Sequence, residues 1–297
     1  MGLERSGLPG RVQPWRDVLY DGPAPSHLPP TEFRSLRSAY IAAGGAFGSA
    51  GDIEREYARE DAAVAAWGAE DEMVLWFEHD LYDQLLLIRL LSMLPPQAGA
   101  KVSLVCSDTY LGPLAPDRFP ALFDQRRRLT AQQIALGTRA WQAFGADTPE
   151  PLAGIVAEGT APLPYLAPAL GRFLEDYPSE QDGLSRSERQ ALRAVAAGAT
   201  TPAEAFAACA RMEAAIFMGD WTFWTIVRRL AAGASPLVAI GASMQDAIGL
   251  TPAGQEVLSG RADAVALNGI DRWMGGVHLT PERLWRRAPA GDLRPSS

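Results

Sequence analysis

Three ionisable side chains stand in a row within the segment WFEHDLYDQ, residues 76–84. Glu78, His79 and Asp80 directly follow the apolar run MVLWF at 73–77, which predicts a central strand buried on both faces. In open α/β sheets, ligands bind at the carboxyl ends of the strands, where the next helix also presents its positive N-terminus. A histidine between carboxylates can ligate a metal ion or move a proton while a carboxylate orients the imidazole. The segment therefore predicts a catalytic or ligand-binding crevice.

The same residues also fit an interpretation without any function. A helix is predicted over residues 80–94, and Asp80 is its natural N-cap. Asp83 falls in the first turn, where a negative charge interacts favourably with the helix dipole, and His79 can be satisfied by a backbone carbonyl. If the crevice is functional, Asp83 and Gln84 join its ligand-binding residues.

Two distant segments could contribute to the same crevice. In WRDVLYDGP, residues 15–23, Asp17 follows a predicted strand, so its carboxylate could join the others in attracting a divalent cation, whereas Asp21 is better explained by a turn. In DRWMGGVHL, residues 271–279, two glycines allow close approach of the backbone to a ligand. If this segment folds back, His278 completes a catalytic site with His79, and Arg272 binds the ligand.

A structural interpretation of residues 271–279 is favoured over the functional one. The glycine pair can simply make a turn, while Trp273 and Trp285 anchor the C-terminal tail to a core. Asp271 then pairs with Arg272 or Arg286 without a functional role.

The amino-acid composition and the absence of several known motifs restrict the classes to which the protein can belong. The chain has 297 residues, of which 47% are hydrophobic and 21% charged, as in a folded protein of two domains. It lacks a Gly-rich phosphate loop, a nucleophile elbow, a His-Glu-x-x-His motif and a Cys-x-x-Cys motif. Cys106 and Cys209 lie in apolar segments and are predicted to be core thiols. No apolar stretch reaches about 18 residues and the start does not resemble a signal peptide, so a cytoplasmic protein without a membrane partner is expected.

The first part of the chain predicts an α/β domain over residues 1–125. Short apolar runs alternate with helical patterns, which is typical of a Rossmann-like, mostly parallel sheet. The expected order is a strand at 11–16, helices at 31–43 and 49–67, the central strand at 73–77, the helix at 80–94 and a strand at 101–106.

A helical connector is predicted over 126–182 and a winged-helix-like α+β domain with a C-terminal tail over 183–297. Polar turn formers at 178–183 mark the boundary between them. Three helices follow, at 185–197, 201–214 and 220–232, and Ser185 and Glu188 form a capping box at the first. A strand at 236–240 and the segment IGLTPAGQEVL complete the order of a winged helix.

Charge is distributed unevenly between these parts. From residue 185 onward there are 12 Arg and 10 acidic residues, or +2, so a net charge of −8 leaves −10 for the first 184 residues. An acidic surface repels nucleic acid, which could therefore contact only the C-terminal domain. The third helix is expected to bury Phe223, Trp224, Val227 and Leu230 and to expose Asp220, Thr222, Thr225, Arg228 and Arg229. This thin basic surface disfavours DNA binding without excluding it, and protein contact fits as well.

The chain resembles the bacterial family called domain of unknown function 1835. The resemblance rests on VLWFEHDLYDQL at 74–85 with the upstream Trp15-x-Asp17 and Gly22-Pro23, and on later segments including GLSRSER at 183–189, MGD at 218–220 and RWxGGVHL at 272–279. It covers nearly the whole chain but implies no activity. Such proteins usually begin with a further strand and a Gly-Asp-Ser-like turn, so the resemblance implies that a first strand is missing here.

Two hypotheses for the function follow. In the first, the protein is ligand-responsive: the acidic crevice binds a small molecule or a metal ion, and the C-terminal domain mediates a protein or nucleic-acid contact. In the second, it is a metal-assisted hydrolase with His79 as ligand or general base, Glu78, Asp80 and Asp17 as carboxylate partners, and His278 from the second domain. A divalent metal is the only cofactor predicted.

Overall fold

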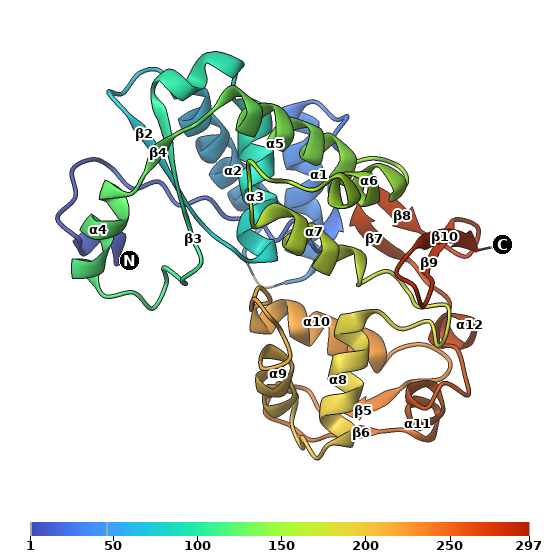
Figure 1. Cartoon of the computed structure of the whole chain (residues 1–297). Helices are drawn as coiled ribbons and strands as arrows, with labels where there is room; N and C mark the ends of the chain where they lie inside the picture. The colour runs from blue at the N-terminus through green and yellow to red at the C-terminus, as the bar shows by residue number, and fades with distance from the viewer. Residues whose placement is uncertain (1, 46, 297) are drawn as a thin grey trace.

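Two clusters of buried apolar side chains organise the chain, which a computed structural model describes over residues 2–45 and 47–296. The first cluster draws its residues mainly from the segment between Leu19 and Tyr177, and the second from the segment between Leu184 and Val257. We call the two parts the first body and the second body. In Figure 1 the first body lies above the second. The fold is a mixed α/β arrangement with small sheets.

A parallel strand pair with its connecting helix forms the centre of the first body. Strand β2 (Met73–Glu78) pairs with β3 (Val102–Ser107), and helix α3 (Leu81–Met93) joins them. Helix α3 is apolar on nearly every face and is buried almost throughout, which agrees with the continuous apolar pattern of its sequence. The predicted strand and the following helix are thus confirmed. The prediction that this strand is central and buried on both faces is wrong, because β2 lies at one edge of the sheet and only Leu75 and Phe77 are buried. The short strand β4 (Arg127–Arg128) adds to β3 in the antiparallel direction, so the sheet is smaller than predicted.

The prediction of a strand at residues 11–16 is wrong. These residues are irregular, and Pro14 interrupts the segment. The backbone N–H of Arg16 donates to the carboxylate of Glu60 at 3.1 Å instead of to a neighbouring strand. The backbone therefore finds its partner on a helix, and no sheet forms at this position.

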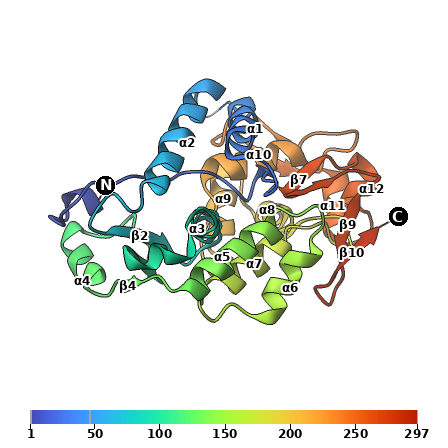
Figure 2. The same ribbon diagram turned by 90° about the horizontal axis from the view of Figure 1, so that it is seen from above.

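Further helices lie on both sides of α3 (Figure 2). Short 3-10 turns lie at Leu3–Arg5, Pro96–Ala100 and Pro116–Arg118. The remaining helices of the first body are α1 (Pro30–Ala43), α2 (Ala50–Ala65), α4 (Phe119–Asp124), α5 (Ala131–Phe144), α6 (Glu150–Glu158) and α7 (Leu166–Leu174). Figure 2 shows α5, α6 and α7 on the side of α3 opposite to α1 and α2.

The second body consists of three helices, a two-stranded ribbon and two short helices. In order they are α8 (Arg186–Ala196), α9 (Pro202–Ala210), α10 (Asp220–Leu230), β5 (Val238–Ile240), β6 (Ile248–Leu250), α11 (Pro252–Leu258) and α12 (Ala264–Asn268). Strands β5 and β6 are antiparallel. The predicted capping box is confirmed, since the Ser185 and Glu188 side chains each accept from the other's backbone N–H.

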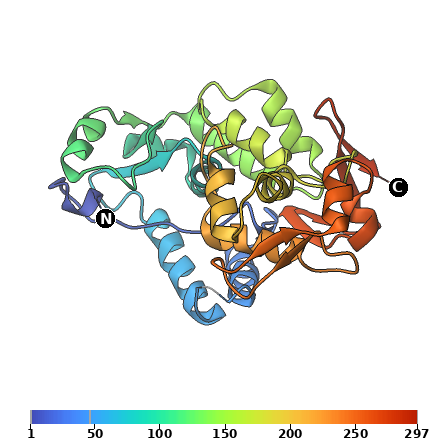
Figure 3. The ribbon, with the colours of Figure 1, turned by 90° about the horizontal axis from the view of Figure 1, so that it is seen from below.

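The C-terminal tail returns to the first body. Strand β7 (Arg272–Gly275) pairs in parallel with the two-residue strand β1 (Gly22–Pro23) and antiparallel with β8 (Val277–Leu279). Strands β9 (Leu284–Arg287) and β10 (Leu293–Ser296) form a hairpin beside them. Met274, Val277 and Leu279 belong to the buried cluster of the first body. All three views, including Figure 3 from below, place the N-terminus and this tail at opposite ends of the molecule.

The two consecutive glycines of the tail are needed for this return. Gly275 has a φ of +62°, and a Cβ at Gly276 would lie 2.2 Å from the carbonyl oxygen of Gly145 at the end of α5. The close approach predicted for these glycines is therefore made to α5, not to a ligand. The structural interpretation of the pair as a turn describes it correctly.

No helix in the described part of the chain is both long enough and apolar enough to span a membrane.

Candidate functional site

The carboxyl end of β2 is held in place by its own side chains. The backbone N–H of Glu78 donates to the Asp83 carboxylate at 2.5 Å, and the Gln84 amide donates to the Glu78 carbonyl at 2.7 Å. The Glu78 carboxylate itself accepts from the backbone N–H of Leu111 at 2.6 Å, in the loop that follows β3. Asp83 and Gln84 thus fix the turn between strand and helix, and Glu78 fixes the neighbouring loop.

Asp80 caps helix α3, as the sequence indicates. Its carboxylate accepts from the backbone N–H of Asp83 at 3.1 Å. Burial raises the pKa of Asp80 to about 6 and that of Asp83 to about 7, and the neighbouring charge of Glu78 adds to both shifts. The first turn of α3 therefore carries two carboxyl groups that can hold protons near neutral pH.

His79 points into an aromatic environment. Its ring centroid lies 5.1 Å from that of Tyr110, in the loop after β3, and 6.0 Å from that of Tyr165, just before α7. The ring atom Nδ1 is buried and has no hydrogen-bond partner among the described residues. An imidazole nitrogen without a partner is costly in a buried place unless a further group binds there. Among the predicted residues, Oε1 of Gln84 and Nε of Arg272 are also buried without a partner, but His79 is the one with Tyr110 and Tyr165 beside its ring.

We call the group at the carboxyl end of β2 the strand-end cluster; it consists of Glu78, His79, Asp80, Asp83, Gln84 and Tyr110. Cys106 on β3 lies next to this cluster. Its thiol is 3.5 Å from the Gln84 amide nitrogen, and burial raises the pKa of the thiol to about 11. At neutral pH it is a protonated, unreactive thiol, in agreement with the expected core role.

The strand-end cluster faces the second body. The hydroxyl of Tyr110 accepts from the backbone N–H of Ile216 at 2.5 Å, and Ile216 belongs to the loop between α9 and α10. On the other side of α3's first turn, the ring of Tyr20 contacts Tyr82 at 6.4 Å and Phe217 at 5.0 Å between centroids. Tyr110 therefore contacts the loop at 211–219 directly, and His79 is connected to this loop through Tyr110.

Asp17 does not join the strand-end cluster. Its side chain is completely buried and forms an ion pair with Arg37 at 2.5 Å, with Arg89 at 3.7 Å. Asp21 accepts from the hydroxyl of Tyr40 at 3.0 Å. Because two guanidiniums neutralise Asp17 inside the core, the prediction that it helps to bind a ligand or cation is corrected to a structural role.

His278 and Arg272 have partners of their own, and none of these contacts involves His79. His278 stacks on Trp273 with ring centroids 4.4 Å apart, and its Nε2 lies 2.7 Å from the Asp271 carboxylate. Arg272 forms an ion pair with Glu188 at 3.1 Å and donates to the carbonyl of Asp176. Burial opposes the charge of Glu188, but Arg272 and Arg229 hold its pKa down at about 2. Arg272 therefore joins the tail to α8 rather than binding a ligand.

A metal site of the predicted kind is not formed. Within residues 2–45 and 47–296, no group of three or more His, Cys, Asp and Glu side chains is arranged to hold a metal ion. The reason is visible in the hydrogen bonds, since Glu78, Asp80 and Asp83 all accept from backbone N–H groups. The described residues therefore give no support to a metal site shared by His79 and His278.

The exposed face predicted for the third helix of the second body also needs correction. Thr222 is buried, and the Tyr20 hydroxyl donates to it at 3.4 Å. Trp221 packs with Ile41, Ile53 and Tyr57 of the first body. The first turn of α10 is therefore covered by the first body, and Arg229 is engaged with Glu188.

Tyr110 and Tyr165 were not predicted from the sequence. Tyr110 follows β3 at its carboxyl end, so the reasoning that singles out Glu78–Asp80 after β2 could have found it. Tyr165 follows Pro164 directly before α7, and no local pattern signals its approach to His79.

Comparisons with protein-family models, with curated proteins and with solved structures found no match to the chain.

Proposed function

We propose that the protein is ligand-responsive: a small molecule binds at the carboxyl end of β2, and the second body responds to it. The observation that carries this proposal is the buried, unpartnered Nδ1 of His79 beside Tyr110, whose hydroxyl holds the backbone of the second body at Ile216. A ligand that displaces or reorients Tyr110 acts directly on that contact.

The surrounding groups favour a ligand with a positively charged or hydrogen-donating nitrogen. Glu78 and Asp80 contribute negative charge, and the faces of Tyr110 and Tyr165 attract cations. The neutral form of His79 can accept a hydrogen bond from the same group. A small organic amine combines these requirements better than an anion does.

We also propose that the chain is related to domain of unknown function 1835, with a Rossmann-like first body and a winged-helix-like second body. The order α8, α9, α10, β5, β6 supports a winged-helix-like second body, and the β2–α3–β3 unit supports a Rossmann-like first body. Because the first turn of α10 packs on the first body, we assign this helix to contact within the protein rather than to a DNA groove. No observation favours the metal-assisted hydrolase.

The proposal is tested with a panel of small amines, amino acids and nucleosides, using thermal shift and hydrogen exchange. At least one amine should stabilise the wild type in a saturable way and change the exchange of the amides at 214–219. His79→Ala should lose both effects. His27→Ala is the matched control, since His27 is exposed and lies in the loop before α1.

Two results would contradict the proposal. One is a ligand response that His79→Ala retains in full. The other is the absence of any saturable amine binding to the wild type while His79→Ala only lowers the melting temperature, which makes His79 a packing residue.

A further inference from the structure

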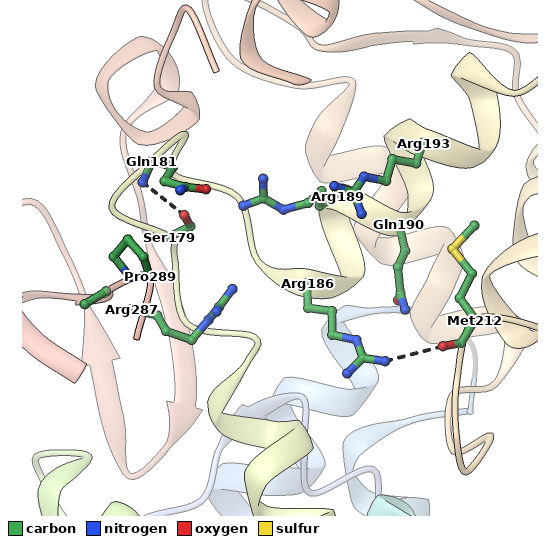
Figure 4. A pocket seen from close by; sticks show the side chains of 10 residues that line it. Ser179, Gln181, Arg186, Arg189, Gln190, Arg193, Met212, Arg287 and Pro289 are labelled. Carbon is green, nitrogen blue, oxygen red and sulfur yellow. Dashed lines mark hydrogen bonds between the residues drawn. The ribbon is translucent and has the colours of Figure 1, made fainter. Parts of the chain in front are cut away.

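A cavity of about 490 Å³ lies where the second body meets the C-terminal tail. Its walls come from the segment before α8, from α8 itself, from the loop after α9 and from β9, as Figure 4 shows. The lining residues are Ser179, Gln181, Arg186, Arg189, Gln190, Arg193, Met212, Arg287, Ala288 and Pro289. Cavities of this size suit small molecules. The strand-end cluster does not contribute to this lining, so the cavity is a separate site.

Four arginines give the cavity its chemical character. Arg186, Arg189 and Arg193 are three or four residues apart on α8, which places them along one face of the helix. Arg287 approaches from the tail, and in Figure 4 its guanidinium extends toward this face. The lining contains no acidic residue.

Two of the four guanidiniums are already neutralised. Arg186 pairs with Glu175 at 2.5 Å and with Glu213 at 3.4 Å, and Arg189 forms a two-pronged contact with Asp182. These pairs hold the side chains at the edge of the cavity. Their charge is largely compensated.

The other two guanidiniums lack a partner. Within the described residues, the side chains of Arg193 and Arg287 form no hydrogen bond or ion pair with the rest of the protein. Arg193 is exposed, but the Nε atom of Arg287 is buried and unpartnered. A buried donor of a charged group without an acceptor costs free energy that a bound anion would recover.

We infer that this cavity binds a small molecule with two anionic groups, one at Arg193 and one at Arg287. Phosphate and carboxylate groups both match the planar fork of a guanidinium. The ligand's shared chemistry is therefore a pair of oxyanions within one small molecule. Because one guanidinium belongs to α8 and the other to the tail, the ligand links these two elements.

A small anion fits this cavity better than a nucleic-acid backbone does. The cavity is a local recess rather than a basic stripe along a surface. Glu175, Asp182 and Glu213 already compensate Arg186 and Arg189, so an extended polyanion would find only two unpaired guanidiniums here.

Isothermal titration of the full chain with pyrophosphate and with citrate tests the inference at matched ionic strength. We expect saturable binding of at least one of them, and the comparison tells phosphate from carboxylate chemistry. Arg193→Gln and Arg287→Gln should each weaken the affinity about tenfold or more, since each removes a charge-assisted contact. Arg287→Lys should retain part of it, because the charge remains.

Arg228→Gln is the matched control, because Arg228 is an exposed arginine at the end of α10 outside the cavity. Its affinity should equal that of the wild type. Circular dichroism and the melting temperature verify that each variant is folded. Equal weakening by Arg228→Gln, unchanged affinity in both cavity variants, or no saturable binding to the wild type would overturn the inference. So would binding of a single-stranded oligonucleotide that excludes pyrophosphate and citrate.

Discussion

Arg37 shows how a charged side chain can stabilise the inside of this protein. It is fully buried, pairs with Asp17, and donates to the carbonyls of Asp21 and Val18 at 2.7 and 3.0 Å. Removing one member of such a pair leaves the other charge buried without compensation, which costs about 3–5 kcal/mol.

We therefore expect Arg37→Met to lower the free energy of unfolding by that amount, measured by urea denaturation. The double variant Arg37→Met/Asp17→Leu should recover part of the loss. Arg139→Met, which breaks the exposed pair with Glu158, should cost less than about 1 kcal/mol. Equal losses in the buried and the exposed variants would show that Arg37 does not compensate a buried charge.

The raised pKa of Asp83 predicts that the stability of the protein depends on pH. Burial raises its pKa from 3.8 to about 7, so between these values the folded chain binds a proton that the unfolded chain has lost. The stability contributed by this proton is present below pH 4 and is lost as the pH rises toward 7, with a slope of at most about 1.4 kcal/mol per pH unit.

Asp83→Asn should remove this dependence. Between pH 5 and pH 8, the free energy of unfolding of the variant should improve relative to wild type by about 1–3 kcal/mol. Urea denaturation at several pH values measures it. Because the pKa of Asp80 and that of Glu60 are also raised, to about 6 and about 8, a smaller slope should remain. A variant with the same slope as wild type would contradict the assignment.

The fit between the tail and helix α5 depends on glycine. Since a Cβ at Gly276 would collide with the carbonyl of Gly145, Gly276→Ala forces the tail away from the end of α5. We expect a loss of about 1–3 kcal/mol in the free energy of unfolding, the usual cost of overpacking. Gly171→Ala is the control: it lies inside α7, its added methyl group meets no atom within 4 Å, and it should leave stability unchanged or raise it slightly. Similar effects of both substitutions would refute the close contact.

The sequence predicts elements well where the pattern is local. The apolar run of β2, the cap at Asp80 and the capping box at Ser185 are all formed by residues within a few positions of one another. The strand expected at 11–16 does not form because Pro14 interrupts the segment and the backbone N–H of Arg16 donates to a side chain on α2, Glu60, which the local sequence does not reveal.

The candidate site was predictable in part for the same reason. Glu78, His79 and Asp80 stand together because they are consecutive, and they do lie at a strand end. Asp17 and Arg272 were misassigned because their partners, Arg37 and Glu188, come from helices whose sequences give no sign of an ion pair. Thr222 was expected to be exposed because the helical pattern of α10 alone does not show that the first body covers it.

The C-terminal tail connects the two bodies of the molecule. It follows the second body in the sequence, but it packs against the first body. Native-state hydrogen exchange can show to which body it belongs energetically. We expect the amides of 272–279 to open together with those of α5, and later than those of α11, because Met274, Val277 and Leu279 lie in the first buried cluster. Opening of 272–279 together with α11 would refute this.

The parallel pairing of β1 with β7 also sets a time order for synthesis. Gly22 leaves the ribosome early, but its partner Met274 is made almost at the end of the chain. At roughly 5–20 residues per second, the wait is on the order of 10–50 s. Throughout that time the places later filled by Met274, Val277 and Leu279 are open, so the nascent first body exposes apolar surface to chaperones and to other chains.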